Sequence, residues 1–110
     1  LKTASATTTN ATPTPVGSIA TLTDNTMLVK VYIVGDTSTN TSVAYEKTAR
    51  VVNSAGVVTI LTITSDYTSE SGALAAARAT IVASGVNISA EVTGVAATTI
   101  DWKVTFVIIR

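Results

Sequence analysis

The chain has 110 residues, with seven basic and seven acidic side chains and neither histidine nor cysteine. This length corresponds to one domain. Without histidine the usual general base and the commonest metal ligand are missing, and without cysteine there are no disulfides or thiolate metal sites. The charges are scattered singly, so there is no basic stripe for a nucleic acid and no polybasic membrane anchor. We expect no cofactor, no nucleic-acid partner and no membrane insertion.

Threonine makes up about a fifth of the chain, and charged residues make up 13%. The usual charged share is about 25%. β-Branched residues favour strands, and a soluble monomer with so few charges has little colloidal protection. The composition therefore favours a β-rich domain whose surface is partly covered by other subunits. A surface solvated by threonine hydroxyls is the alternative.

The first segment, residues 1–17, is rich in Thr, Ala and Pro and has little periodicity. Pro13 and Pro15 favour extended backbone and cannot donate to a strand ladder. We interpret residues 1–17 as an extended arm or linker and residues 18–110 as a β-sandwich domain.

Strand patterns begin after this arm. A first strand is expected at 18–23 and a stronger one at 26–35, with the turn signal Asp24-Asn25 between them. In the stronger strand, alternate residues form one apolar face and one face that is only partly polar: Met27, Val29, Val31 and Ile33 against Leu28, Lys30, Tyr32 and Val34. Residues 36–42 are a loop by composition.

Two hairpins are expected in the next part of the chain. Strands at 43–53 and 57–64 flank the turn from Asn53 to Gly56, because Asn and Gly supply the positive φ angles that tight turns require. After a loop at 65–74, strands from about Arg78 and at 86–92 flank Ser84-Gly85. The alanine run also fits one short helix near 73–78, which stays open as an alternative.

The last strand is apolar on one face throughout. Its other face begins with polar residues and ends with Val107 and Ile109. A strand buried on both faces must be covered twice, by a second sheet or by another chain. We therefore predict an oligomer interface that includes Val107, Ile109 and Val34. The fold class is all-β, an antiparallel sandwich or barrel-like meander of about seven short strands.

Side chains with catalytic potential are sparse. No histidine can activate the serines and threonines, and the lysines fit ordinary surface positions better than a Ser–Lys dyad. Asp66 and Glu70 fit a solvated loop better than a glycosidase pair across a cleft. Asp36 and Asn40 lack the oxygen density of a calcium loop. We expect no enzymatic activity. Asn40, Asp66 and Tyr67 remain as a candidate ligand-contact loop, because Tyr67 is the one aromatic residue expected in a polar loop.

Four stretches, read in order, carry a resemblance to a known class of protein. They are "TTTNATPTPVGSIATL" (7–22), "VYIVGDTSTNTSVAYEKTARVVNSAGVVTIL" (31–61), "ASGVNISAEVTG" (83–94) and "TTIDWKVTF" (98–106). Together they resemble a β-domain found in structural proteins of tailed bacteriophages. The tract at 69–79 departs from that pattern, because it has Ala and Leu where the family often has acidic residues and an aromatic.

The resemblance implies a virion component, either a tail-fibre or head-fibre domain or a capsid decoration. Such parts are commonly homotrimeric, so the implied partners are further copies of the chain and other virion proteins. It implies no catalytic residues. A receptor- or glycan-binding adhesin tip that uses the loop of Asn40, Asp66 and Tyr67 on a host surface is the alternative function.

Overall fold

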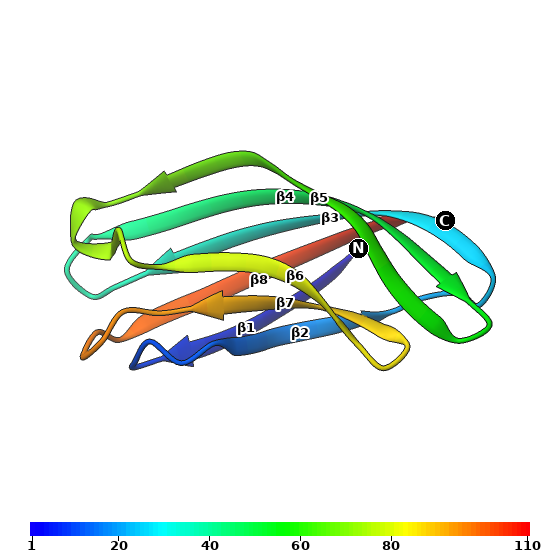
Figure 1. The fold of residues 1–110 in the computed structure, drawn as a ribbon. Coiled ribbons are helices and arrows are strands. Elements are labelled where there is room, and N and C mark those ends of the chain that lie inside the picture. Colours follow the sequence, from blue (N-terminus) through cyan, green and yellow to red (C-terminus); the bar gives the residue numbers. More distant parts are fainter.

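A computed structural model of the chain describes residues 1–110, which fold into two packed antiparallel sheets (Figure 1). The strands are β1 (Lys2–Thr8), β2 (Thr14–Ala20), β3 (Asn25–Asp36), β4 (Ser42–Ser54), β5 (Val57–Glu70), β6 (Arg78–Ser84), β7 (Asn87–Thr93) and β8 (Ile100–Ile109). The only helical element is a 3₁₀ turn, η1 (Gly72–Leu74). The predicted all-β antiparallel fold class is confirmed.

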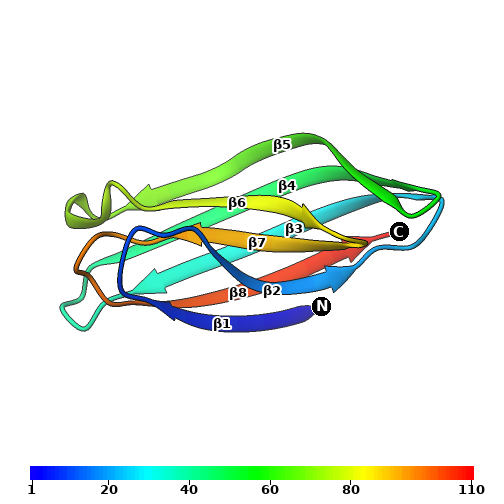
Figure 2. The same ribbon diagram turned by 60° about the horizontal axis from the view of Figure 1, so that its bottom comes forward.

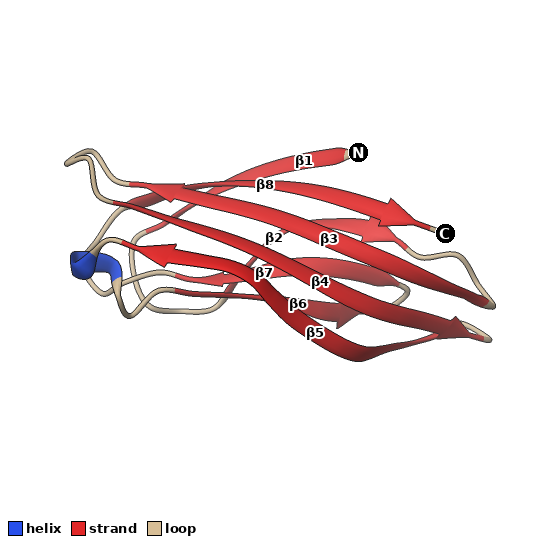
Figure 3. Ribbon diagram, turned by 90° about the horizontal axis from the view of Figure 1, so that it is seen from above, coloured by secondary structure: helices blue, strands red, loops and turns tan.

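The two sheets differ in width. One sheet has five strands in the order β1-β8-β3-β4-β5, and the other has three in the order β2-β7-β6. At one side of the sandwich β1 contacts β2, and at the other β5 contacts β6. Figures 2 and 3 show that the narrow sheet covers one face of the wide sheet and leaves the other face open.

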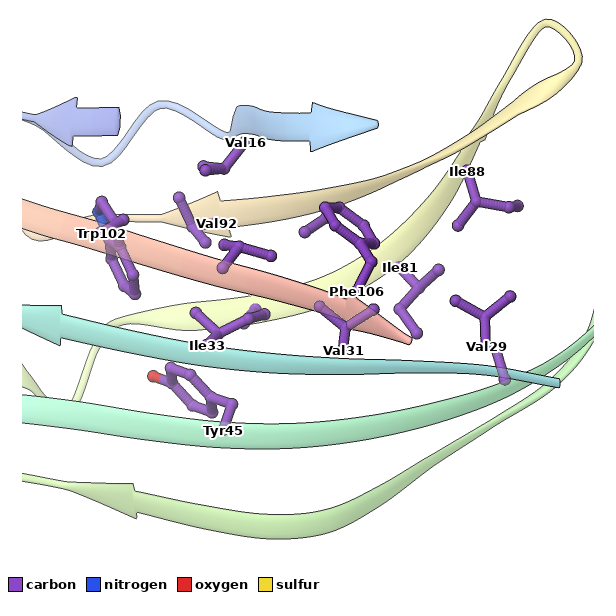
Figure 4. Close-up of a cluster of buried hydrophobic side chains, with 14 of the residues drawn as sticks. Val16, Val29, Val31, Ile33, Tyr45, Ile81, Ile88, Val92, Trp102 and Phe106 are labelled. Atoms are coloured by element: carbon purple, nitrogen blue, oxygen red, sulfur yellow. The ribbon is translucent and has the colours of Figure 1, made fainter. Parts of the chain in front are cut away.

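The core fills the space between the sheets with alternate residues of the longer strands. Val29, Val31 and Ile33 of β3 are buried, as are Trp102 and Phe106 of β8. Figure 4 shows these side chains packed against residues of the narrow sheet: Val16, Ile81, Ile88 and Val92. The apolar faces predicted for β3 and β8 are therefore the core faces.

Gly35 is the next inward-facing position of β3. The ring of Trp102 occupies the space that a side chain at this position would need. A Cβ at Gly35 would lie 2.9 Å from two ring carbons of Trp102 and 3.0 Å from Ile100. Real Cβ atoms do not approach other heavy atoms this closely, so the packing of Trp102 depends on glycine at this position.

The tight turns form at the predicted positions, although the positive φ angles of the β4–β5 turn fall on Ala55 and Gly56 and not on Asn53. The β4–β5 turn has φ 53° at Ala55 and 86° at Gly56, and the Gly56 amide donates to the side-chain oxygen of Asn53 over 2.9 Å. The β6–β7 turn has φ 60° at Gly85. Both are two-residue connections between paired strands, a length that favours positive φ angles.

The segment expected to be an arm, 1–17, differs from that expectation. Residues 2–8 are β1, paired without interruption to β8, and β2 begins at Thr14 rather than Ser18. The side chains of β1 are small because β2 passes close by: a Cβ on Gly17 would lie 2.4 Å from that of Ala4. Small residues give little hydrophobic alternation, which is why sequence periodicity missed the strand.

The expected loop at 65–74 is also partly wrong. β5 continues to Glu70, and β4 pairs with it as far as Val43. Its residues are polar because both faces of this edge strand are exposed over most of its length, so composition resembled a loop. Beyond it, only Gly72–Leu74 are helical, and β6 begins at Arg78 as favoured over the helix at 73–78.

Candidate functional site

The open face of the five-stranded sheet, which we call the outer face, is left uncovered by the three-stranded sheet (Figure 3). Successive side chains of a strand point to opposite faces, and here one set fills the core. The other set lies in rows across paired strands, for example Val34 beside Lys103 on β8 and Ala44 on β4. The next row has Tyr32 beside Thr105 and Glu46.

Large apolar side chains are exposed on this outer face along β3 and β8. Leu28, Tyr32 and Val34 are 38%, 40% and 43% exposed, and Ile109 is 57% exposed. Leu28 pairs directly with Ile109, which places two exposed aliphatic side chains next to each other. Exposed large apolar residues that are contiguous on a surface mark interaction sites.

Charges of both signs are interspersed with these apolar side chains. Lys30 pairs with Val107 on β8 and with Thr48 on β4, and its Nζ donates to the Thr48 hydroxyl over 3.3 Å. Glu46 pairs with Tyr32, and Arg50 with Leu28. The outer face therefore has no single-sign field that would attract a polyanion.

The structure places all three predicted interface residues on the outer face. Val34 and Ile109 are exposed and Val107 is half-buried, while Ile108 packs from the opposite face of β8 against the core. The carboxyl end of β8 is thus apolar on both faces but covered on one. The role of Val34, Val107 and Ile109 as an oligomer interface stays a prediction.

The three predicted ligand-contact residues do not form one site. Asn40 lies in the β3–β4 turn with φ 62°, whereas Asp66 and Tyr67 belong to β5 and not to a loop. Tyr67 pairs with Glu46, which is six residues from Asn40, or roughly 20 Å along an extended strand. Tyr67 is 54% exposed and belongs to the outer face, in the row of Tyr32.

Asp66 sits at an irregularity of β5. The register against β4 shifts between Glu46 and Lys47, which leaves Asp66 as the extra residue of a bulge. Its carboxylate accepts hydrogen bonds from the Thr48 and Thr64 hydroxyls. These contacts fix the bulged strand against β4, so the carboxylate has a structural partner on its own chain.

A hydroxyl-lined pocket lies at one end of the sandwich, where the β3–β4 turn, η1 and the β7–β8 loop meet. Its volume is about 360 Å³. Five threonines line it, namely Thr37, Thr39, Thr41, Thr98 and Thr99, and the Thr37 hydroxyl lies 2.6 Å from that of Thr41. Sequence reasoning placed a loop here but gave no sign of the pocket, because residues 98–99 come from a distant part of the chain.

One ionisable side chain is strongly perturbed. Burial, a hydrogen bond from the Tyr45 hydroxyl to the Glu70 carboxylate and the charge of that carboxylate raise the pKa of Tyr45 above its ordinary value of 10.0, while Arg78 acts in the opposite sense. Tyr45 is 4% exposed. The hydroxyl stays protonated and ties β4 to the end of β5, so this contact is a structural one.

The chain contains no group of three or more acidic, His or Cys side chains that could hold a metal ion. None of its helical segments has the length and apolarity needed to cross a bilayer.

The sequence and the structure were compared with known proteins. No protein-family model matches the sequence, and no curated protein matches it. Among solved structures, the tailspike protein of Acinetobacter baumannii phage AM24 is similar over 97% of this chain, with 13% sequence identity and a TM-score of 0.41. The chain spans 26% of the length of that tailspike.

Proposed function

We propose that this chain is a non-catalytic structural domain of a bacteriophage particle, and that it associates with further copies of itself through the outer face of the five-stranded sheet. The observation that carries the proposal is the set of exposed large apolar side chains on that face, with Val34 and Leu28 on β3 and Ile109 beside Leu28 on β8. Burying such side chains against a second copy is favourable by about 25 cal/mol for each Å² of apolar surface.

The size of the outer face fits a stable interface. Five strands spaced about 4.8 Å apart and roughly ten residues long cover about 800 Å². An interface of standard size buries about 800 Å² on each partner. The interspersed charges of Lys30, Glu46 and Arg50 favour a partner that also carries both signs, as a second copy does.

The phage assignment and the number of copies rest on the ordered sequence stretches described above. Those stretches resemble virion β-domains that commonly form homotrimers. The proposed partners are thus two further copies and the neighbouring virion proteins, and the proposed location is the virion, as a fibre domain or a capsid decoration.

Measurement of the native mass, with matched variants, tests the proposal. Val34→Asp puts a charge on the outer face, and Val86→Asp puts the same charge on the β6–β7 turn, where Val86 is 51% exposed. We expect the wild type and Val86→Asp to assemble. Val34→Asp should weaken the association constant by at least about tenfold, as at an interface hot spot. A monomeric wild type, or equal assembly of both variants, would overturn the proposal.

A second candidate function, the binding of a host-surface receptor or glycan, is favoured by the threonine-lined pocket. The pocket lies at the end of the sandwich where the loops gather, and both chain termini lie toward the other end (Figure 1). A domain attached through either terminus would present the pocket outward. Hydroxyl side chains offer both donors and acceptors to a sugar.

A glycan array and a host-cell binding assay with the isolated chain test this second function. Thr99→Lys would fill the pocket, and Thr3→Lys adds the same charge to an exposed position of β1. Binding that is lost in Thr99→Lys alone supports the pocket. No binding by the wild type, or equal binding by both variants, excludes it.

A further inference from the structure

The sandwich has four strand edges without a partner, and they differ in how well they are protected from pairing. The edges are β1 and β5 of the wide sheet and β2 and β6 of the narrow one. Unpaired strand edges attract other strands, and proteins block them with proline, bulges or charges. The presence or absence of these features shows which edges the fold leaves available.

β2 and β5 are blocked. β2 contains Pro15, which has no N–H to donate, and its register shifts at Gly17, where φ is 70°. β5 has two register shifts against β4, which leave Leu61 and Asp66 as extra residues. A bulge breaks the regular spacing of the edge groups and bends the strand, so neither edge offers a continuous ladder.

β1 and β6 are open. Each has seven residues and pairs without any register shift, β1 with β8 and β6 with β7. Neither contains proline, and each has a single charge, at its first residue. Both charges fold back onto their own chain: Lys2 donates to the Ser18 carbonyl, and Arg78 to the carbonyls of Ala75 and Ala77. The middle of each edge therefore carries only uncharged side chains.

The two open edges lie at opposite sides of the sandwich. β1 contacts β2 at one side, and β5 contacts β6 at the other. In a ring of copies, the β1–β2 side of one copy meets the β5–β6 side of the next. Of the four strand pairs that could then form, only β1 with β6 joins two unblocked edges.

We propose that β1 of one copy pairs with β6 of the next copy as an antiparallel ladder, a contact distinct from the outer face. This inference rests on the self-association proposed above and specifies how neighbouring copies are joined. Such a head-to-tail contact produces a ring where its rotation closes and never a two-fold dimer, and backbone hydrogen bonds link the wide sheet of one copy to the narrow sheet of the next.

Strand direction and charge agree with an antiparallel ladder. The arrows of β1 and β6 point in opposite directions in Figures 1 and 2, so copies related by rotation about an axis along the strands bring these edges together antiparallel. In that direction Lys2 lies beside the Ser84 end of β6, and Arg78 beside the Thr8 end of β1. A parallel ladder would instead place the two cations together, which is destabilising.

Engineered disulfides test the pairing, because the native chain has no cysteine. Thr3→Cys with Ala83→Cys joins β1 to β6, and Ser5→Cys with Ala83→Cys covers a shifted register. A disulfide requires Cα atoms within about 7 Å. Two control pairs each join an open strand to an exposed position on a blocked strand. They are Thr3→Cys with Thr68→Cys of β5, and Ala83→Cys with Ala20→Cys of β2.

Under mild oxidation we expect covalent multimers from a β1–β6 pair and none from the control pairs. If the wild type is a monomer by native mass, the proposed self-association fails and this inference fails with it. If the wild type assembles but multimers appear only in the controls, or in no variant, the strand pairing is wrong and the outer-face proposal stands.

A proline variant gives an independent check without cysteine. Ser84 pairs with Asn87 across the two-residue turn, and such a closing pair exchanges both hydrogen bonds. The N–H of Ala83 therefore points to the open edge. Ala83→Pro should keep the monomer fold and weaken association about tenfold, the value of roughly one hydrogen bond, whereas Ala83→Ser keeps the N–H and should assemble normally. Equal association of both would overturn the pairing.

Discussion

The indole Nε1 of Trp102 donates a hydrogen bond to the hydroxyl oxygen of Thr8 over 2.9 Å. Both residues are buried: Trp102 is 0% exposed and Thr8 is 3% exposed. The contact joins the centre of the core on β8 to the last residue of β1, and Gly94 packs against the same hydroxyl without room for a Cβ, which would lie 2.5 Å away. Thr8 thus gives the largest core side chain its polar partner.

Thr8→Val should destabilise the domain by about 1–3 kcal/mol, because the indole N–H then stays buried without an acceptor. Urea unfolding followed by Trp102 fluorescence measures the change. Thr3→Val is the matched control, since Thr3 lies on the same strand but is exposed. Its urea midpoint should equal that of the wild type within the error of the measurement. If Thr8→Val unfolds at the same urea concentration as the wild type, a water molecule takes the place of the hydroxyl as acceptor of the indole N–H.

Gly35→Ala should cost about 1–3 kcal/mol through overpacking, since its Cβ meets the Trp102 ring at 2.9 Å and the ring has no free space to move into. Thermal unfolding of the variant checks the loss. Gly72→Ala serves as the control, because no atom lies within 4 Å of its Cβ position. If Gly35→Ala melts with the wild type, the packing of Trp102 is looser than described.

Stability should fall at alkaline pH because of Tyr45. Its pKa is raised above 10.0 in the folded chain, so above pH 10 the unfolded chain loses this proton first and gains stability relative to the fold. The contribution is complete below pH 10 and declines as pH rises toward the folded-state pKa. Unfolding free energies measured between pH 8 and about 11.5 should decline less steeply for Tyr45→Phe than for the wild type. Parallel curves would contradict the assignment.

Val107→Asp should break assembly before it breaks the monomer fold. Val107 is half-buried on the outer face, beside Lys30, so a carboxylate there can still reach water and a cation in a single copy. In an assembled interface the same carboxylate would lose its water. Sedimentation and circular dichroism of one sample separate the two effects. A variant that unfolds as a monomer would show that Val107 belongs to the core.

Much of the fold could be predicted from alternation. The inward residues of β3 and β8, such as Val31 and Trp102, follow a strict period of two. Gly56, which has φ 86°, marks the β4–β5 turn in the sequence. The partly polar face of β3, with Tyr32 and Val34, lies on the outer face, and its role as an interface stays a prediction.

The errors have one physical origin. β1 and β5 are edge strands that bury few large apolar side chains: β1 turns only Ala4, Ala6 and Thr8 toward the core, and most of β5 is exposed. Their sequences therefore carry little hydrophobic pattern. Composition therefore suggested an arm at 1–17 and a loop at 65–74. The threonine pocket could not be foreseen either, because Thr37 and Thr99 meet only through the pairing of β3 with β8.

The pairing of β1 with β8 also has a consequence for biosynthesis. Thr3 lies opposite Thr105, so β1 finds its partner only in the last strand of the fold. The wide sheet cannot form completely until β8 has left the ribosomal exit tunnel, and contacts between such distant positions slow folding. Until then the β1 segment has no strand partner, and unpaired strands of this kind are prone to aggregation.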